Sequence, residues 1–226
     1  DAGMIAEGWN GFNVLHGAAA RVGGLDLGFT PGAAGRNTQA ILDGAQAGEI
    51  DVVYLLGADE VDMTKLAKSF VIYQGHHGDA GAHAADVILP GAAYTEKPGT
   101  YVNTEGRVQL ARRAAFPPGD AREDWTVLRA LSAVIGDPLP FDDLSALRRR
   151  IYAACPHFAR IDDVEAASWG EFGDAGAMDP APFALPVTNF YMTDPISRVS
   201  PTMAACTDLL TGAGASDDGG KTGTDG

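Results

Sequence analysis

The chain has 226 residues, of which 46% are hydrophobic and 20% charged, a composition typical of a globular protein large enough to bury a core. The 30 acidic residues outnumber the 16 basic ones, and the formal net charge of −14 argues against a surface that binds nucleic acid or an anionic membrane. Its two cysteines, Cys155 and Cys206, lie far apart and lack CxxC spacing, which argues against a disulfide framework, a zinc site or an iron–sulfur motif within these residues.

The chain opens on a glycine-rich apolar stretch that starts at Asp1 and carries no signal pattern. From this beginning we expect a piece of a longer chain. No apolar run approaches the roughly 20 residues that span a bilayer, so we expect no membrane insertion. The first predicted helix covers residues 37–47, with Asn37 or Thr38 as its cap and Gly48 as its stop.

Three short apolar segments follow, at residues 51–56, 70–73 and 84–89. They are typical of buried strands, and the third is typical of a strand buried on both faces, as in a parallel sheet. A short helix around residues 63–68 separates the first two. We therefore predict an α/β fold with a doubly wound parallel sheet. The third segment stops at Pro90, so the residues after it lie at the carboxyl end of a strand, where open α/β sheets bind ligands.

A long loop after the third strand combines glycines with polar side chains. The glycines permit backbone conformations or close approaches that a Cβ forbids, and they are Gly91, Gly99 and Gly106. The polar residues are Glu96, Lys97, Asn103, Glu105 and Arg107. These groups either bind a ligand or satisfy one another and the loop backbone, and the residues alone leave both alternatives open.

Two amphipathic helices are predicted after the loop, at residues 122–135 and 143–154. Asp142 is a plausible cap for the second, and Pro156 lies beyond its end. Because each helix carries an apolar stripe, we expect both to pack on the sheet.

The remaining residues are expected to be less regular. Residues 168–186 mix Gly, Pro and acidic side chains into an irregular connection, and residues 189–203 regain apolar anchors as an extended arm. The tail at 211–226 lacks large apolar side chains, so we expect it to be disordered. The chain is thus divided into an α/β domain over 1–136, a helical and extended region over 137–210, and the tail.

One cluster could hold a metal ion. His76, His77 and Asp79, with His83 as the weakest candidate, could place imidazoles and a carboxylate around zinc or another divalent ion. Their spacing is not an established ligand pattern. Histidines in a glycine-rich loop more often serve as hydrogen-bonding partners, so no metal site is expected.

Two further patterns have ordinary explanations. Glu96 beside Lys97, or Glu105 near Arg107, could act in acid–base catalysis, but neighbouring charges on a loop are usually salt-bridged or solvated. The run GAAGRN at 32–37 could cradle a phosphate at a helix start. It lacks the established phosphate-binding patterns, and a turn with a helix cap explains it equally well.

Three stretches carry a family resemblance. They are YQGHHGDAGAHAADVILPGAAYTEKPGTYVNTEGRVQ at 73–109, PPGDAREDWTVLRALS at 117–132 and NFYMTDPISR at 189–198. Together they resemble the C-terminal part of the large iron–sulfur subunit of respiratory complex I, which is the G subunit of the bacterial NADH-quinone oxidoreductase. The ADVILP segment, Glu96, Gly99 and the run at 103–107 also resemble molybdopterin-dependent oxidoreductases, to which that domain is related.

The resemblance implies the molybdopterin oxidoreductase type of fold and a place in an assembly that passes electrons from NADH to quinone. It implies that 2Fe-2S and 4Fe-4S clusters lie in an N-terminal part outside this chain, which itself holds no cofactor and no catalytic residue. On this interpretation the loop is a vestigial cofactor-binding loop, now structural, with Glu96, Gly99, Asn103, Glu105 and Arg107 as its key positions.

The implied partners are the other peripheral-arm subunits of complex I. The implied location is the cytoplasmic face of a bacterial inner membrane, or the matrix side in a mitochondrion. Two alternatives remain. One is a fragment of an active molybdopterin-dependent oxidoreductase, and the other is a metal-dependent hydrolase that uses His76, His77 and Asp79.

Overall fold

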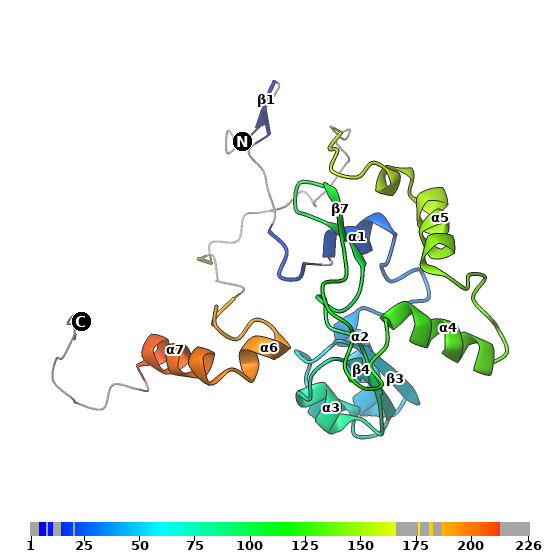
Figure 1. The fold of residues 1–226 in the computed structure, drawn as a ribbon. Helices are drawn as coiled ribbons and strands as arrows, with labels where there is room; N and C mark the ends of the chain where they lie inside the picture. The colour runs from blue at the N-terminus through cyan, green and yellow to red at the C-terminus, as the bar shows by residue number, and fades with distance from the viewer. Residues whose placement is uncertain are drawn as a thin grey trace.

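The computed structural model describes residues 5–7, 9–10, 15–19, 21–165, 176, 181–182 and 187–212 (Figure 1). It contains a parallel sheet in the order β3-β4-β5, with bounds Val52–Leu56, Phe70–Gly75 and Val87–Pro90. This arrangement confirms the α/β class with a parallel sheet.

The sheet buries one face against α2 (Thr38–Ala47), the 3-10 helix η1 (Met63–Leu66) and α3 (Ala80–Ala84). Asn37 caps α2 and Gly48 ends it in the left-handed region, both as predicted. The core on this face consists of Leu42, Ala45, Val53, Leu55, Leu66, Val71, Tyr73 and Ala82.

The third strand differs from its prediction. It begins at Val87 rather than at Ala84, because residues before it form α3, which the glycine-rich sequence did not predict. Asp79 caps this helix by accepting a hydrogen bond from the Ala80 amide.

The opposite face of the sheet is covered mainly near the carboxyl end of β4, where Gln74 is fully buried, and the prediction of a strand buried on both faces is wrong for β5. Val52, Leu56 and Phe70 alternate with core residues and are 54%, 51% and 47% exposed. On the edge strand β5, Val87 and Ile88 are 39% and 54% exposed.

The predicted loop contains an antiparallel hairpin, formed by β6 (Gly99–Val102) and β7 (Val108–Ala111). Its inner residues Val102 and Val108 form a second core with Phe158 of η2 (Pro156–Ala159). Ile151 and Tyr152 of α5 (Leu144–Ala154) pack on this second core.

The prediction that α5 packs on the sheet is therefore wrong. Its cap also differs, because Asp143 accepts a hydrogen bond of 2.7 Å from the Ala146 amide, whereas Asp142 pairs with Arg129. The preceding helix, α4 (Asp124–Val134), contacts the sheet at its first residue, because the Asp124 carboxylate accepts a hydrogen bond from Gln74 of β4.

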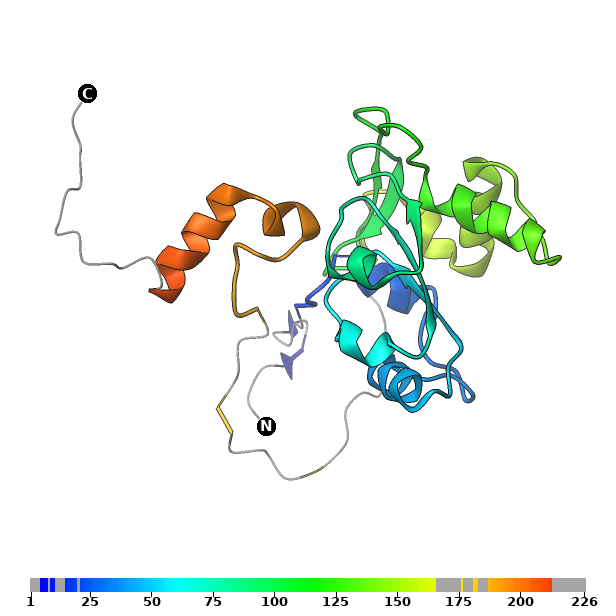
Figure 2. The ribbon, with the colours of Figure 1, turned by 90° about the horizontal axis from the view of Figure 1, so that it is seen from below.

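The last described segment is helical where an extended arm was predicted. Asp194 caps α6 (Pro195–Arg198) and Ser200 caps α7 (Pro201–Thr211), each with proline in the first turn. In both views these helices lie on the opposite side of the sheet from α4 and α5 (Figures 1 and 2).

The other described elements are β1 (Ile5–Ala6), β2 (Trp9–Asn10) and α1 (Arg21–Asp26). Most of the irregular connection predicted at 168–186 lies outside the described residues, and so does the tail beyond Gly212. The division into three parts remains a prediction.

Candidate functional site

The carboxyl ends of the three parallel strands meet at one edge of the sheet, which is where this class of fold binds ligands. We call this the carboxyl edge and define it by Asp59 and Glu60, which follow β3, and by Asp79, which follows β4. None of the helices in the described part of the chain combines the length and apolarity needed to cross a bilayer.

Asp59 is the most buried charged group of the carboxyl edge, with 8% of its surface exposed. Its carboxylate accepts a hydrogen bond of 2.9 Å from the Tyr73 hydroxyl and one of 3.0 Å from the Gly81 amide. Burial raises the pKa of Tyr73, and the hydrogen bond to Asp59 raises it further, so the phenol stays a donor. The sequence placed Asp59 in a turn after a strand but did not single it out.

Asp79 and Glu60 share one guanidinium. Arg198 donates from Nε to Asp79 Oδ2 at 2.5 Å and from Nη1 to Glu60 Oε1 at 3.0 Å. The bond from Arg198 is the main reason that the pKa of Asp79 is lowered. Asp79 also caps α3 through the Ala80 amide at 2.8 Å. Arg198 comes from α6, far along the chain, and sequence reasoning missed it.

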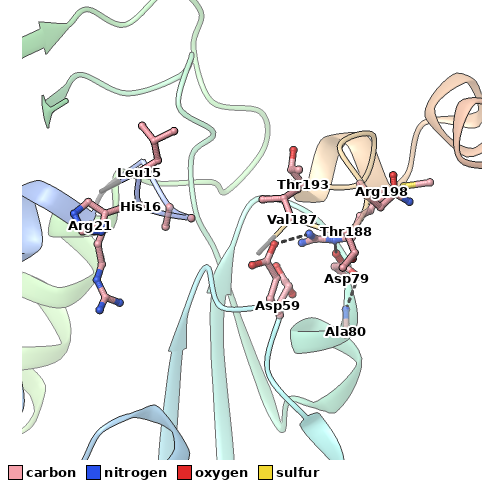
Figure 3. A pocket seen from close by; sticks show the side chains of 15 residues that line it. Leu15, His16, Arg21, Asp59, Asp79, Ala80, Val187, Thr188, Thr193 and Arg198 are labelled. Atoms are coloured by element: carbon pink, nitrogen blue, oxygen red, sulfur yellow. Dashed lines mark hydrogen bonds and ion pairs between the residues drawn. The ribbon is translucent and has the colours of Figure 1, made fainter. Parts of the chain in front are cut away.

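A cavity of about 1030 Å³ opens beside this ion pair. Figure 3 shows Asp59, Asp79 and Arg198 on one side and His16 and Arg21 on the other. The walls come from the N-terminal residues, the carboxyl edge and the segment that carries α6.

A second polar network lies around β4. Gln74 is fully buried, and its Nε2 donates to Asp124 Oδ1 at 2.9 Å. The Tyr54 hydroxyl donates to Gln74 Oε1, and Lys97 forms an ion pair with Asp124. Burial raises the pKa of Tyr54, with a further contribution from the charge of Asp124. These bonds join the sheet, the loop and α4.

The predicted loop residues fall into two groups. Glu96 lies in the turn after β5, where its carboxylate accepts a 2.9 Å hydrogen bond from the Ala93 amide. Gly99 begins β6, and a Cβ there would meet the Tyr101 ring at 2.7 Å.

The other three residues close the tip of the hairpin. Asn103 Oδ1 accepts hydrogen bonds from the amides of Glu105 and Arg107, at 3.1 and 2.9 Å. Arg107 donates to Glu105 at 2.6 Å and to the Asp162 carbonyl at 2.5 Å. Gly106 has φ of +86°, which a turn at this position requires. The loop polar groups thus bond to the loop and its neighbours.

The residues of the predicted histidine cluster make separate contacts and do not converge on one point. The His76 and His77 rings meet edge to face with centroids 5.0 Å apart, while Asp79 bonds to Arg198 and α3. Burial lowers the pKa of His76, and the charges of His77 and Lys97 lower it further. No group of three or more His, Cys, Asp or Glu side chains suited to a metal ion occurs in the described part of the chain.

The GAAGRN run at 32–37 serves α2. Asn37 Oδ1 accepts a hydrogen bond of 2.9 Å from the Ala40 amide, and Arg36 pairs with Glu49 at 2.9 Å. A helix cap and an ion pair therefore account for these two polar side chains.

Comparison with protein families matches residues 2–134 to the model described as molybdopterin oxidoreductase. Residues 163–206 match a second model, which describes the C-terminal region of the G subunit of NADH-ubiquinone oxidoreductase. Among solved structures, acetylene hydratase from Pelobacter acetylenicus is similar with a TM-score of 0.40 and 18% identity, covering 52% of this chain and 20% of that one.

Three curated relatives are subunits of NADH-ubiquinone oxidoreductase. The mitochondrial 78 kDa subunit of Candida albicans is 50% identical over 210 residues, 88% of this chain and 28% of the relative. The 78 kDa subunit of Neurospora crassa is 46% identical, and the match covers 90% of this chain and 27% of the relative. The 75 kDa subunit of Reclinomonas americana is 44% identical, and the match covers 89% of this chain and 29% of the relative. The chain thus spans less than a third of the length of these relatives.

Proposed function

The chain belongs to the molybdopterin oxidoreductase family, and from this premise we propose that it is a structural part of a large NADH-ubiquinone oxidoreductase subunit, without a cofactor of its own. The relatives of 44 to 50% identity support the choice of assembly, and so does the match of residues 163–206 to the C-terminal region of the G subunit. The iron–sulfur clusters that pass electrons from NADH towards quinone belong, on this proposal, to residues outside this chain.

One observation carries the structural role: the polar groups of the candidate loop bond to the protein itself. Asn103 closes the hairpin tip through two backbone amides, and Lys97 and Gln74 both bind Asp124 at the start of α4. A polar group that already has its partner inside the fold stabilises that fold, and it has less capacity left for a substrate. These bonds therefore hold the sheet, the hairpin and α4 together.

We propose that this chain has no catalytic residue and no metal ligand, and that the weak candidates His76, His77 and Asp79 serve neither role. We expect no independent catalytic activity. The expected partners are other subunits of the peripheral arm, and the expected location is the matrix side in a mitochondrion or the cytoplasmic face of a bacterial inner membrane.

The experiment places Gln74→Leu or Asn103→Leu in the complete subunit and follows both the amount of assembled complex and its NADH:ubiquinone activity. A structural role predicts less assembled complex, with activity per assembled complex unchanged and the cluster spectra intact. Normal assembly with a lower turnover per complex would instead place the loop in the reaction and overturn the proposal.

A further inference from the structure

The carboxyl edge concentrates negative charge. Asp59, Glu60 and Asp79 lie together, and within the described residues the cation paired with them is Arg198, through Glu60 and Asp79. In a chain of net charge −14 this edge repels anions, although open α/β sheets usually bind ligands at this edge.

The backbone donors of the edge are also occupied. Amides in the first turn of a helix usually provide the binding groups for a phosphate. Here the Ala80 amide donates to Asp79 at 2.8 Å and the Gly81 amide donates to Asp59 at 3.0 Å. The protein's own carboxylates thus take the place of an external anion.

The cofactor that the family name implies does not fit this donor set. Molybdopterin carries a phosphate group, which needs free amides or cationic side chains. At the carboxyl edge it would meet three carboxylates, and the guanidinium of Arg198 is already shared between two of them.

We propose that the carboxyl edge is a guanidinium-binding surface whose ligand is Arg198 of the same chain. Through this contact Arg198 holds α6 and α7 against the α/β unit, by which we mean the sheet β3-β4-β5 with α2, η1 and α3. Among the described residues, the hydrogen bonds and ion pairs that join 187–212 to that unit are those of Arg198. Figures 1 and 2 show α6 near the sheet and α7 leading away from it.

The geometry favours arginine over any other cation. One planar guanidinium reaches Asp79 from Nε and Glu60 from Nη1, a fork that a lysine ammonium on its flexible stem does not reproduce. The side chains of Arg198 and Asp79 are each only 21% exposed, whereas Glu60 is 70% exposed. Asp79 is therefore the stronger of the two partners, because its pair with Arg198 is less screened by solvent.

Hydrogen exchange followed by mass spectrometry tests this on the full 226-residue chain. Arg198→Ala should speed exchange in the amides of 195–211 by about tenfold, Arg198→Lys should fall between it and the unchanged chain, and Asp79→Asn should act in the same direction while keeping a cap for α3. Arg160→Ala is the matched control, because it breaks the exposed pair with Glu165 and should leave 195–211 unchanged.

A salt titration of the unmodified chain provides a second test that does not depend on a variant. Added sodium chloride should weaken the exposed pair of Arg198 with Glu60 and so speed exchange in 195–211 slightly, but not in β3 and β4, and Arg198→Ala should abolish this salt effect. Equal exchange of 195–211 in the unmodified chain and in Arg198→Ala would overturn the proposal. Neither test depends on the assembly to which the chain belongs.

Discussion

Gln74 on β4 donates a hydrogen bond of 2.9 Å to the carboxylate of Asp124 at the start of α4, although the two residues are 50 positions apart. Gln74 is fully buried, and its side-chain oxygen Oε1 accepts a hydrogen bond from the Tyr54 hydroxyl. Gln74→Leu leaves both partners without their bond, so we expect the free energy of unfolding to fall by about 1 to 3 kcal/mol. Chemical denaturation measures this.

The matched control is Gln39→Leu, which removes an exposed bond of 2.8 Å to Asp43 on α2. Its expected cost is below about 0.5 kcal/mol. Equal losses in the two variants would contradict a special role for the Gln74 network.

The hairpin tip gives a second prediction. Asn103 accepts hydrogen bonds from two backbone amides and is partly buried, so Asn103→Leu should lower the free energy of unfolding by about 1 kcal/mol. Asn103→Asp keeps the acceptor oxygen and should lose less. A thermal melt of the two variants distinguishes them, and an unchanged melting temperature in Asn103→Leu would contradict the stabilising role of Asn103 at the hairpin tip.

The cap of α5 gives a third prediction. Asp143 bonds to the Ala146 amide, so Asp143→Ala should cost about 1 kcal/mol of the free energy of unfolding. Asp142→Ala should cost clearly less, because the pair of Asp142 with Arg129 leaves Asp142 85% exposed. Urea unfolding of both variants is the measurement, and the reverse order would return the cap to Asp142.

The two faces of the sheet can be compared with one pair of neighbours. Leu55 is 5% exposed and Leu56 is 51% exposed on the same strand. Leu55→Ala should cost about 2 to 5 kcal/mol through the cavity it leaves, and Leu56→Ala should cost less than about 1 kcal/mol. Similar costs in this chain, measured by denaturation, would show that the second face is covered after all.

His76 gives a prediction on pH. Burial lowers its pKa in the folded chain below the ordinary value of 6.5, so the unfolded chain binds the proton first. Its contribution to stability is complete above the ordinary pKa and is lost as the pH falls through the folded one. His76→Gln should therefore flatten the decline in melting temperature between about pH 7.5 and about pH 5.5.

His83→Gln is the control for this pH dependence, because His83 is exposed on α3. It should leave the decline as it is in the unmodified chain. If the decline persists in His76→Gln but disappears in His83→Gln, the pH dependence comes from His83 and the prediction for His76 is wrong.

Local signals in the sequence predicted much of the fold. The cap at Asn37, the stop at Gly48 and the apolar runs of β3 and β4 lie where they were expected, because each depends on residues next to one another in the chain. The hairpin was missed because its strands are short and lie among turn residues.

The candidate site was predicted less well because its contacts are distant in sequence. Nothing near Arg198 indicates that it bonds to Asp79, 119 positions away, and nothing near Gln74 indicates Asp124. The polarity of the loop was visible, but its use within the protein depends on the hairpin and on α4. Residue types therefore suggested where the polar groups lie, and only their geometry indicates what they bind.

The most direct test of the structural, cofactor-free role is a metal and pterin analysis of the purified chain, produced in a host that makes molybdopterin. Molybdenum is measured by mass spectrometry and pterin by the fluorescence of its oxidised form, with an active molybdopterin enzyme from the same host as the control. A cofactor-free role predicts neither molybdenum nor pterin in stoichiometric amount. One molybdenum or one pterin per chain would contradict it.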